Sequence, residues 1–159
     1  GGYDSFTDDI SYSIYEYNPI DNKRIIGNWI EKKIHLPYPL YSHACVFYND
    51  RLWLLGGICN FGATKNVTKL DTSNGDWEEG PILNKYHINF NAFVINNNLY
   101  IVGGDTEESS DHTIEKLDLS ANTWHVIATF SNRIGYSSAV YKNYIYIFSG
   151  DIVDIYTYD

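Results

Sequence analysis

Histidine and cysteine are the side chains best suited to hold a metal ion or to act as nucleophiles, and the chain has five His and two Cys. The histidines follow no metal-ligand spacing; they are His35, His43, His87, His112 and His125. His43 and Cys45 would share one face of a strand, but an inner strand favours a packed imidazole and thiol over a ligand pair. Two Cys, Cys45 and Cys59, are too few for a disulfide framework; buried free thiols are expected, and a single bridge is the alternative. No metal site is predicted.

Neighbouring carboxylates offer little acid/base chemistry. They occur at Asp8-Asp9, Glu78-Glu79 and Glu107-Glu108, where consecutive side chains on a strand or loop diverge. A phosphate-binding loop is not indicated either, because each Gly pair ends an apolar run and no helix is expected after it. The sequence therefore predicts no catalytic residue and no cofactor.

Composition limits the class of protein. The chain has 159 residues, 44% of them hydrophobic, which suits one folded domain, and a net charge of -9. This acidity argues against a nucleic-acid partner, since phosphate binding needs a basic surface. No apolar run approaches the roughly eighteen residues of a membrane helix, and no signal-like segment opens the chain. The cytoplasm is the expected compartment, while one glycosylation sequon, Asn66-Val67-Thr68, keeps an extracellular location open.

A repeat of nearly constant length runs through the chain. Gly pairs stand at Gly1-Gly2, Gly56-Gly57 and Gly103-Gly104, and Ser149-Gly150 takes the fourth equivalent place. Trp29, Trp77 and Trp124 recur at steps of 48 and 47, as do Ala44, Ala92 and Ala139. Two markers with one period predict repeats at 1–57, 58–104 and 105–150, with 151–159 beginning a fourth.

Each repeat is expected to form four short strands and almost no helix. The first two are apolar, with an Asn- or Asp-containing turn between them, and the second is expected to be buried on both faces. They are predicted at 43–48 and 52–55, 91–95 and 99–102, and 138–141 and 145–148. The third alternates polar and apolar residues, which predicts one solvent face; it is expected at 13–17, 67–71, 114–118 and 154–159. The fourth begins at the Trp.

These features resemble kelch repeats, a β-propeller motif. Leu70-Asp71 and Leu117-Asp118 precede Trp77 and Trp124 by the six-residue step of that motif, whereas Asn18 precedes Trp29 by eleven residues. Arg133 lies where kelch units often carry Arg, six residues before Ala139, and the equivalent Tyr38 and Tyr86 depart from the pattern. The resemblance implies an all-β fold, a kelch-type β-propeller segment of four-stranded antiparallel blades.

The length predicts an incomplete ring. Kelch propellers close with about five to seven blades. This chain holds outer strands at 10–34, blades near 42–82 and 89–129, and three strands at 136–159. We expect a partial propeller over 1–159 that belongs to a longer one; completion of the ring by a second copy is the alternative.

One face collects the long loops between second and third strands, at 3–10, 58–66 and 105–113. Their acids are Asp4, Asp8, Asp9, Asp105, Glu107, Glu108 and Asp111. One interpretation is that these acids are solvated surface charges that keep the protein soluble. The other is that they attract a basic segment of a partner protein.

The entries to the first strands supply the remaining candidate partner-binding residues, which are Tyr38, Tyr41, His43, Tyr86, His87, Asn89, Arg133 and Tyr136. The kelch resemblance implies that such positions line the mouth of the central channel and contact peptides. Packing of the tyrosines between blades is the alternative.

The predicted function is a non-catalytic protein-protein interaction scaffold that binds a protein or peptide on this face, without nucleic acid or membrane. Two alternatives remain at this point. One is an enzyme on the same fold, either a copper oxidase or a sugar isomerase; the other is a structural or extracellular assembly protein.

Overall fold

The computed structural model describes residues 2–18, 28–104, 112–130, 137–149 and 152–157. Within these ranges every regular element is a β-strand, which confirms the all-β prediction. None of the described residues forms a helix long and apolar enough to cross a lipid bilayer.

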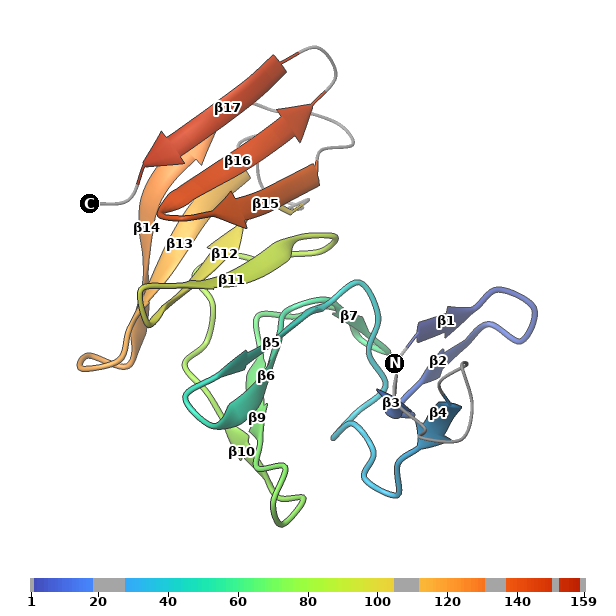
Figure 1. The fold of residues 1–159 in the computed structure, drawn as a ribbon. Helices are drawn as coiled ribbons and strands as arrows, with labels where there is room; N and C mark the ends of the chain where they lie inside the picture. The colour runs from blue at the N-terminus through green and yellow to red at the C-terminus, as the bar shows by residue number, and fades with distance from the viewer. Residues whose placement is uncertain (1, 19–27, 105–111, 131–136, 150–151, 158–159) are drawn as a thin grey trace.

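Two four-stranded antiparallel sheets form the centre of the structure (Figure 1). The first blade consists of β5 (Ala44–Tyr48), β6 (Arg51–Leu55), β9 (Val67–Leu70) and β10 (Trp77–Glu79). The second blade consists of β11 (Asn91–Ile95), β12 (Asn98–Val102), β13 (His112–Asp118) and β14 (Thr123–Phe130). Strands follow one another in chain order across each sheet, as expected of propeller blades.

Smaller sheets lie at both ends of this pair (Figure 1). The C-terminal sheet has β15 (Ser137–Tyr141), β16 (Tyr144–Ser149) and β17 (Ile152–Thr157). At the other end β3 (Tyr15–Asn18) pairs only with β4 (Asn28–Glu31). In the described residues the series of sheets therefore forms part of a ring and does not close.

The long loops between second and third strands are more ordered than expected. Residues 3–10 contain a hairpin of β1 (Gly2–Asp4) and β2 (Asp9–Ser11), with Tyr3 opposite Ile10. Residues 58–66 contain a second hairpin of β7 (Ile58–Cys59) and β8 (Gly62–Ala63). The loop 105–111 lies outside the described residues.

Tight turns join the first and second strands, as their composition predicts. Asn49 and Asp50 have φ values of 50° and 58°, and Asn96 and Asn97 have values of 47° and 58°. Two consecutive left-handed residues define the turn whose twist matches a two-residue hairpin, and Asn and Asp adopt that conformation most readily after Gly.

Strand register confirms the tryptophan repeat and corrects the alanine repeat. Trp77 pairs with Leu70, and Trp124 pairs with Leu117 in the same place of the next blade. Ala44 faces Leu55, directly before its Gly pair, whereas Ala92 faces Ile101, one position earlier. Side chains alternate along a strand, so this offset places the two alanines on opposite faces of their blades. Their spacing in sequence is therefore not a structural equivalence.

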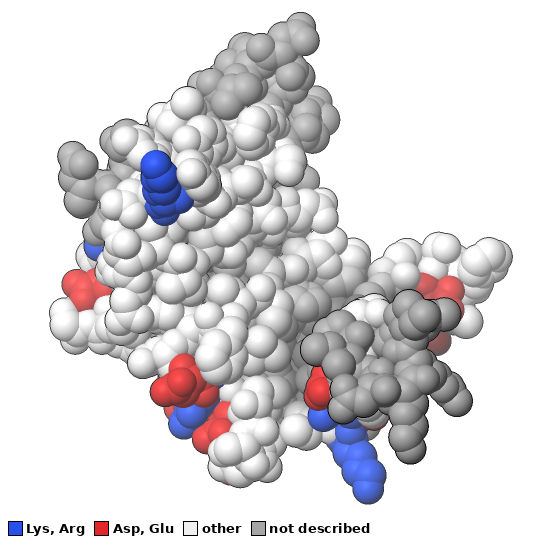
Figure 2. Space-filling model, viewed as in Figure 1, with Lys and Arg blue, Asp and Glu red and all other residues white. Residues whose placement is uncertain are grey.

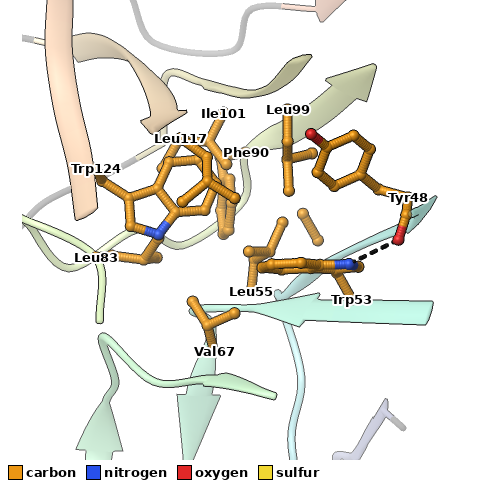
Figure 3. Packing of buried hydrophobic residues seen from close by; sticks show 11 residues of the cluster. Tyr48, Trp53, Leu55, Val67, Leu83, Phe90, Leu99, Ile101, Leu117 and Trp124 are labelled. Carbon is orange, nitrogen blue, oxygen red and sulfur yellow. Dashed lines mark hydrogen bonds between the residues drawn. The ribbon is translucent and has the colours of Figure 1, made fainter. Parts of the chain in front are cut away.

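The main core lies between the two blades (Figure 3). Trp53, Leu55 and Val67 of the first blade meet Leu99, Leu117 and Trp124 of the second, and all six side chains are buried. A further cluster joins the other face of the second blade to the C-terminal sheet. The second strand of the second blade is covered on both faces, as predicted, because β12 is completely buried from Leu99 to Val102. The prediction is wrong for β16, where Ile145 and Ile147 are buried but Tyr144 and Phe148 are 38% and 44% exposed, since no described sheet covers that face.

The third strand of the second blade contradicts the expectation of one solvent face. Thr113, Ile114, Glu115 and Leu117 are all at most 3% exposed. The reason is that β13 lies between two neighbouring sheets, so even its polar residues are covered. Among these polar residues the Glu115 carboxyl is buried and hydrogen-bonded to His87 and Asn84.

The turns after the third strands are built around an aspartate. Asp71 Oδ1 accepts hydrogen bonds from the Ser73 amide and hydroxyl at 2.9 and 2.6 Å. Asp118 Oδ1 accepts from the Ser120 amide and hydroxyl at 2.8 and 2.7 Å. In each case the serine hydroxyl is the main cause that holds the pKa of the carboxyl below its usual range.

Acid titration tests this turn. A folded-state pKa below the unfolded value means that the stabilisation is present above the unfolded pKa and is lost as pH falls through the folded pKa. We expect NMR titration to give Asp118 a lowered pKa, and Ser120→Ala to raise that pKa towards the ordinary value. An unchanged pKa in Ser120→Ala would show that the hydroxyl is not the cause.

The Gly pair of the first blade is required by close packing as well as by backbone conformation. A Cβ at Gly57, where φ is +91°, would lie 2.6 Å from the Tyr41 carbonyl oxygen and 2.8 Å from His43 Cβ. Gly62 has a similar φ of +102° but nothing within 4 Å of such a Cβ. We therefore expect Gly62→Ala to lower the free energy of unfolding by about 1 kcal/mol and Gly57→Ala by about 3 kcal/mol or more. Equal losses in urea unfolding would mean that φ strain alone sets the requirement.

Candidate binding face

Tyr41 joins three segments on the face that carries the long loops. Its amide donates to the Ile58 carbonyl at 3.0 Å and its carbonyl accepts from the Ile58 amide at 2.8 Å, which ties it to the β7–β8 hairpin. Its ring lies 5.4 Å from the Tyr3 ring, centroid to centroid, which ties it to the β1–β2 hairpin. The predicted residue Tyr41 is therefore half-buried at the centre of this face.

Tyr38 lies beside a small cavity on the same face. The cavity has a volume of about 180 Å³ and is lined by Tyr38, Asn66, Val67, Thr68, Glu79, Gly80 and Ile82. Burial raises the pKa of the Tyr38 hydroxyl, and a hydrogen bond with the Asn66 side chain partly offsets this rise. Ile82 is 66% exposed at the rim. A small apolar group could enter here against a polar wall.

Tyr86 is half-buried and stacks with a cation. Lys65 Nζ lies 4.6 Å from the centre of the Tyr86 ring and also donates to the Asn84 carbonyl at 3.0 Å. The ring and the lysine therefore hold each other in place, with part of each exposed to solvent.

His43 and Asn89 have different roles in the linkers. His43 is half-buried, its Nδ1 has no hydrogen-bond partner among the described residues, and burial lowers its pKa. Asn89 is exposed, has a φ of 54°, and its backbone N–H donates to the Ser42 carbonyl at 3.1 Å. Asn89 can contact a partner, whereas the buried imidazole edge of His43 favours the packing interpretation.

His87 corrects one of the predicted contacts, because its side chain is completely buried. Its Nδ1 lies 2.7 Å from the Gly103 carbonyl oxygen, and its Nε2 lies 2.8 Å from Glu115 Oε1. Both His87 and Glu115 are 0% exposed. A side chain without exposed surface cannot contact a partner, so His87 belongs to the scaffold.

The protonation of this pair follows from its partners. A carbonyl only accepts, so His87 Nδ1 donates its proton to Gly103. One proton then lies between Nε2 and Oε1, shared by an imidazolium and carboxylate or by a neutral imidazole and carboxylic acid. The Asn84 amide completes the network by donating to Glu115 Oε2 at 2.8 Å and to the Trp124 carbonyl at 2.7 Å.

His87 also links the two blades. The His87 carbonyl accepts from the Gly57 amide of the first blade at 2.8 Å, while its ring is bound to Gly103 and Glu115 of the second. Glu115 and Asn84 were not predicted from the sequence. A Glu in a strand of alternating polar and apolar residues is expected to face solvent, and Asn84 enters the network through its hydrogen bond to Glu115.

Five predicted residues lie outside the described part of the chain: Asp105, Glu107, Glu108, Arg133 and Tyr136. Their placement on this face stays a prediction.

Charge on the described surface is scattered. Figure 2 shows small separate groups of acidic and basic residues and no continuous basic patch on the side viewed. The β1–β2 hairpin is the most one-sided segment, since Asp4, Asp8 and Asp9 stand there without any Lys or Arg from 2 to 18. The Tyr3 hydroxyl donates to Asp8 at 2.7 Å, and this bond is the main cause that raises the Tyr3 pKa.

The described residues contain no group of three or more His, Cys, Asp and Glu placed to hold a metal ion. Cys45 and Cys59 are free thiols. Cys45 is exposed, which corrects the expectation of a buried thiol, because none of the described residues covers its face of β5. Phe47, on the same face, is 58% exposed.

Two exposed aromatic residues of this face were missed from sequence. Phe6 and Phe61 are each 99% exposed, at the tips of the β1–β2 and β7–β8 hairpins. The signal was present, because each stands five residues after the first Gly of a Gly pair.

Comparison with known proteins agrees with this architecture. The kelch motif model matches residues 88–131. Kelch domain-containing protein 3 of Mus musculus is 29% identical over 72% of this chain and 33% of its own length. Kelch repeat protein M-T8 of myxoma virus is 28% identical over 78% of this chain and 23% of its own length. A putative F-box/kelch-repeat protein of Arabidopsis thaliana is 26% identical over 88% of this chain and 38% of its own length.

Among solved structures, one titled "Structure of YjhT" aligns with a TM-score of 0.68 at 14% identity, over 86% of this chain and 52% of that chain. The fold is thus a β-propeller segment of antiparallel blades. Residues 88–131 match the kelch motif and most of the chain is similar to kelch-repeat proteins, and the chain spans well under half the length of the curated relatives it matches.

Removing Glu115 tests the buried network. Glu115→Ala would leave His87 and Asn84 without the hydrogen-bond partner that they share, so we expect the free energy of unfolding to fall by about 3–5 kcal/mol. Thr68 is the matched control, because it takes the place of Glu115 in the first blade. It pairs with Leu54 and Glu115 pairs with Ile101, and Leu54 and Ile101 each stand two residues before a Gly pair. The buried Thr68 hydroxyl has no hydrogen-bond partner in the described part of the chain. We expect Thr68→Val to be neutral or to stabilise by up to about 1 kcal/mol. Similar losses for both variants in denaturant unfolding would show that the network contributes nothing specific.

Proposed function

We propose that the chain is part of a non-catalytic interaction scaffold that binds a protein or peptide on the face of the second-to-third-strand loops and the linkers between blades. The observation that carries the proposal is the cluster around Tyr41, where a linker and two hairpins meet on a rigid kelch framework. Loops held by a rigid scaffold are the usual location of binding residues.

The side chains around this cluster suit protein recognition. Tyr38, Tyr41 and Tyr86 are half-buried, so each is held in place while part of its ring remains available. Tyrosine combines a large apolar surface with a polar hydroxyl and loses little side-chain entropy on binding, which makes it a frequent anchor in interfaces. The cavity beside Tyr38 supplies a recess for one apolar group of the partner.

The kelch relatives support the same general class of function. Their shared feature with this chain is the repeated blade, which suits a family of scaffolds whose loops carry the specificity. Arg133 and Tyr136, at the entry to β15, are proposed to extend the face towards the C-terminal sheet.

Peptide selection tests this function. A phage-displayed library of random short peptides is selected on the immobilised chain, and the enriched peptides are synthesised and titrated by fluorescence anisotropy. We expect Tyr86→Ala and Arg133→Ala to weaken their binding by about tenfold each, as loss of an interface anchor does. Leu119→Ala is the control, because Leu119 is 48% exposed on the β13–β14 turn, at the opposite end of the blade.

The result would contradict the proposal if the peptides bound both variants as tightly as the parent chain, or lost affinity equally for Leu119→Ala. Thermal unfolding of each variant shows whether the fold is retained, so that loss of structure is not mistaken for loss of a contact.

A further inference from the structure

Two phenyl rings stand at equivalent points of successive repeats. Phe6 follows Gly1 by five residues, and Phe61 follows Gly56 by five residues. Phe6 lies in the turn between β1 and β2, and Phe61 in the turn between β7 and β8. Both side chains are 99% exposed, more than any other large hydrophobic residue among those described.

The blade does not need an aromatic ring at this position. The same offset from Gly103 gives Glu108 in the third repeat, so the repeat tolerates a charged residue there. Neither phenyl ring packs in any of the three hydrophobic clusters. A fully exposed Phe gains nothing from the hydrophobic effect in the isolated chain and gains much when a partner covers it.

Hydrogen bonds hold both hairpin tips in position. In the first hairpin the Phe6 amide donates to Asp4 Oδ1 at 2.8 Å, and the Tyr3 hydroxyl spans the turn to Asp8 Oδ1 at 2.7 Å. In the second the Cys59 thiol donates to the Gly62 carbonyl at 3.4 Å. Ordered tips lower the entropy lost on binding.

Tyr41 fixes the bases of both hairpins. Its backbone pairs with Ile58 of β7 and its ring packs on Tyr3 of β1. The two hairpins that carry Phe6 and Phe61 are therefore joined at their bases by one residue.

Charge around Phe6 indicates the chemistry of the partner. Asp4, Asp8 and Asp9 surround this ring in sequence, and residues 2–18 contain no Lys or Arg. An anionic lipid surface would be repelled by these carboxylates, whereas Lys or Arg of a protein segment would be attracted.

We propose that Phe6 and Phe61 are paired anchors for a basic, apolar segment of a protein partner. Apolar side chains of that segment pack on the two phenyl rings, and its Lys or Arg residues face Asp4, Asp8 and Asp9. This inference rests on the proposed function, because it names the residues and the partner chemistry for the same face.

The peptides selected on the parent chain are the probe for this inference. We expect them to combine apolar residues with Lys or Arg. Phe6→Ser and Phe61→Ser are each expected to lower the affinity roughly ten- to a hundredfold, the value of covering one such side chain. Leu119→Ser is the matched control, and it should leave the affinity unchanged. Because both Phe side chains are exposed, the variants should unfold at the temperature of the parent chain.

The outcomes distinguish failure of the anchors from failure of the whole binding face. Peptides that lose affinity for Tyr86→Ala but bind both Phe variants normally would overturn the anchors and leave the binding face intact. A selection that enriches no binding peptide would count against the binding face and the anchors together. Peptides rich in acids and lacking Lys and Arg would overturn the proposed partner chemistry.

Lipid is the competing surface, and sedimentation with vesicles of neutral phosphatidylcholine tests it. We expect the parent chain to remain in the supernatant. Sedimentation that is abolished in Phe6→Ser and Phe61→Ser would assign the rings to a membrane and overturn the proposal of a protein partner.

Discussion

Packing of one blade on the next is the interaction on which the rest of this structure depends. A four-stranded kelch blade is apolar on both faces, so neither face is stable in water without a neighbour. Trp53, Leu55 and Val67 meet Leu99, Leu117 and Trp124 across the central interface, and all are nearly inaccessible to solvent. The second blade is covered on both sides, and its β13 buries Thr113 and Glu115 almost completely.

Buried polar groups in turn fix how the linker crosses between the blades. His87 is bound through its carbonyl to Gly57 and through its ring to Gly103 and Glu115. The Trp124 indole donates to the Pro81 carbonyl at 3.0 Å, and the Trp77 indole donates to the His35 carbonyl at the same distance. Trp77 and Trp124 therefore each hold the linker that enters their own blade. The tyrosines of the candidate face lie on these linkers, so their positions follow from the core.

Local chemistry explains how much could be predicted from the sequence. Asn49-Asp50 and Asn96-Asn97 favour left-handed turns by themselves, so the hairpins were found. The Trp repeat predicted from the sequence is confirmed, because Trp77 and Trp124 have equivalent cross-strand partners. The alanine repeat is not, because Ala44 and Ala92 lie on opposite faces of their blades. In the candidate site, Tyr38, Tyr41 and Tyr86 do lie near the long-loop face, whereas His87 is buried and Phe6 and Phe61 were overlooked. Exposure of a residue depends on which blade lies beside it, and a single repeat does not contain that information.

The sequence by itself determined most strands, their turns, the repeat and the resemblance to kelch repeats, because these depend on neighbouring residues and on spacing along the chain. The tertiary structure alone decided which polar residues are internal and which aromatic residues meet solvent. Glu115 and His87 are brought together across 28 residues. Phe61, in contrast, extends from a two-stranded hairpin that no other described segment covers. The physical reason is that burial is set by contacts between blades, which bring together residues far apart in sequence.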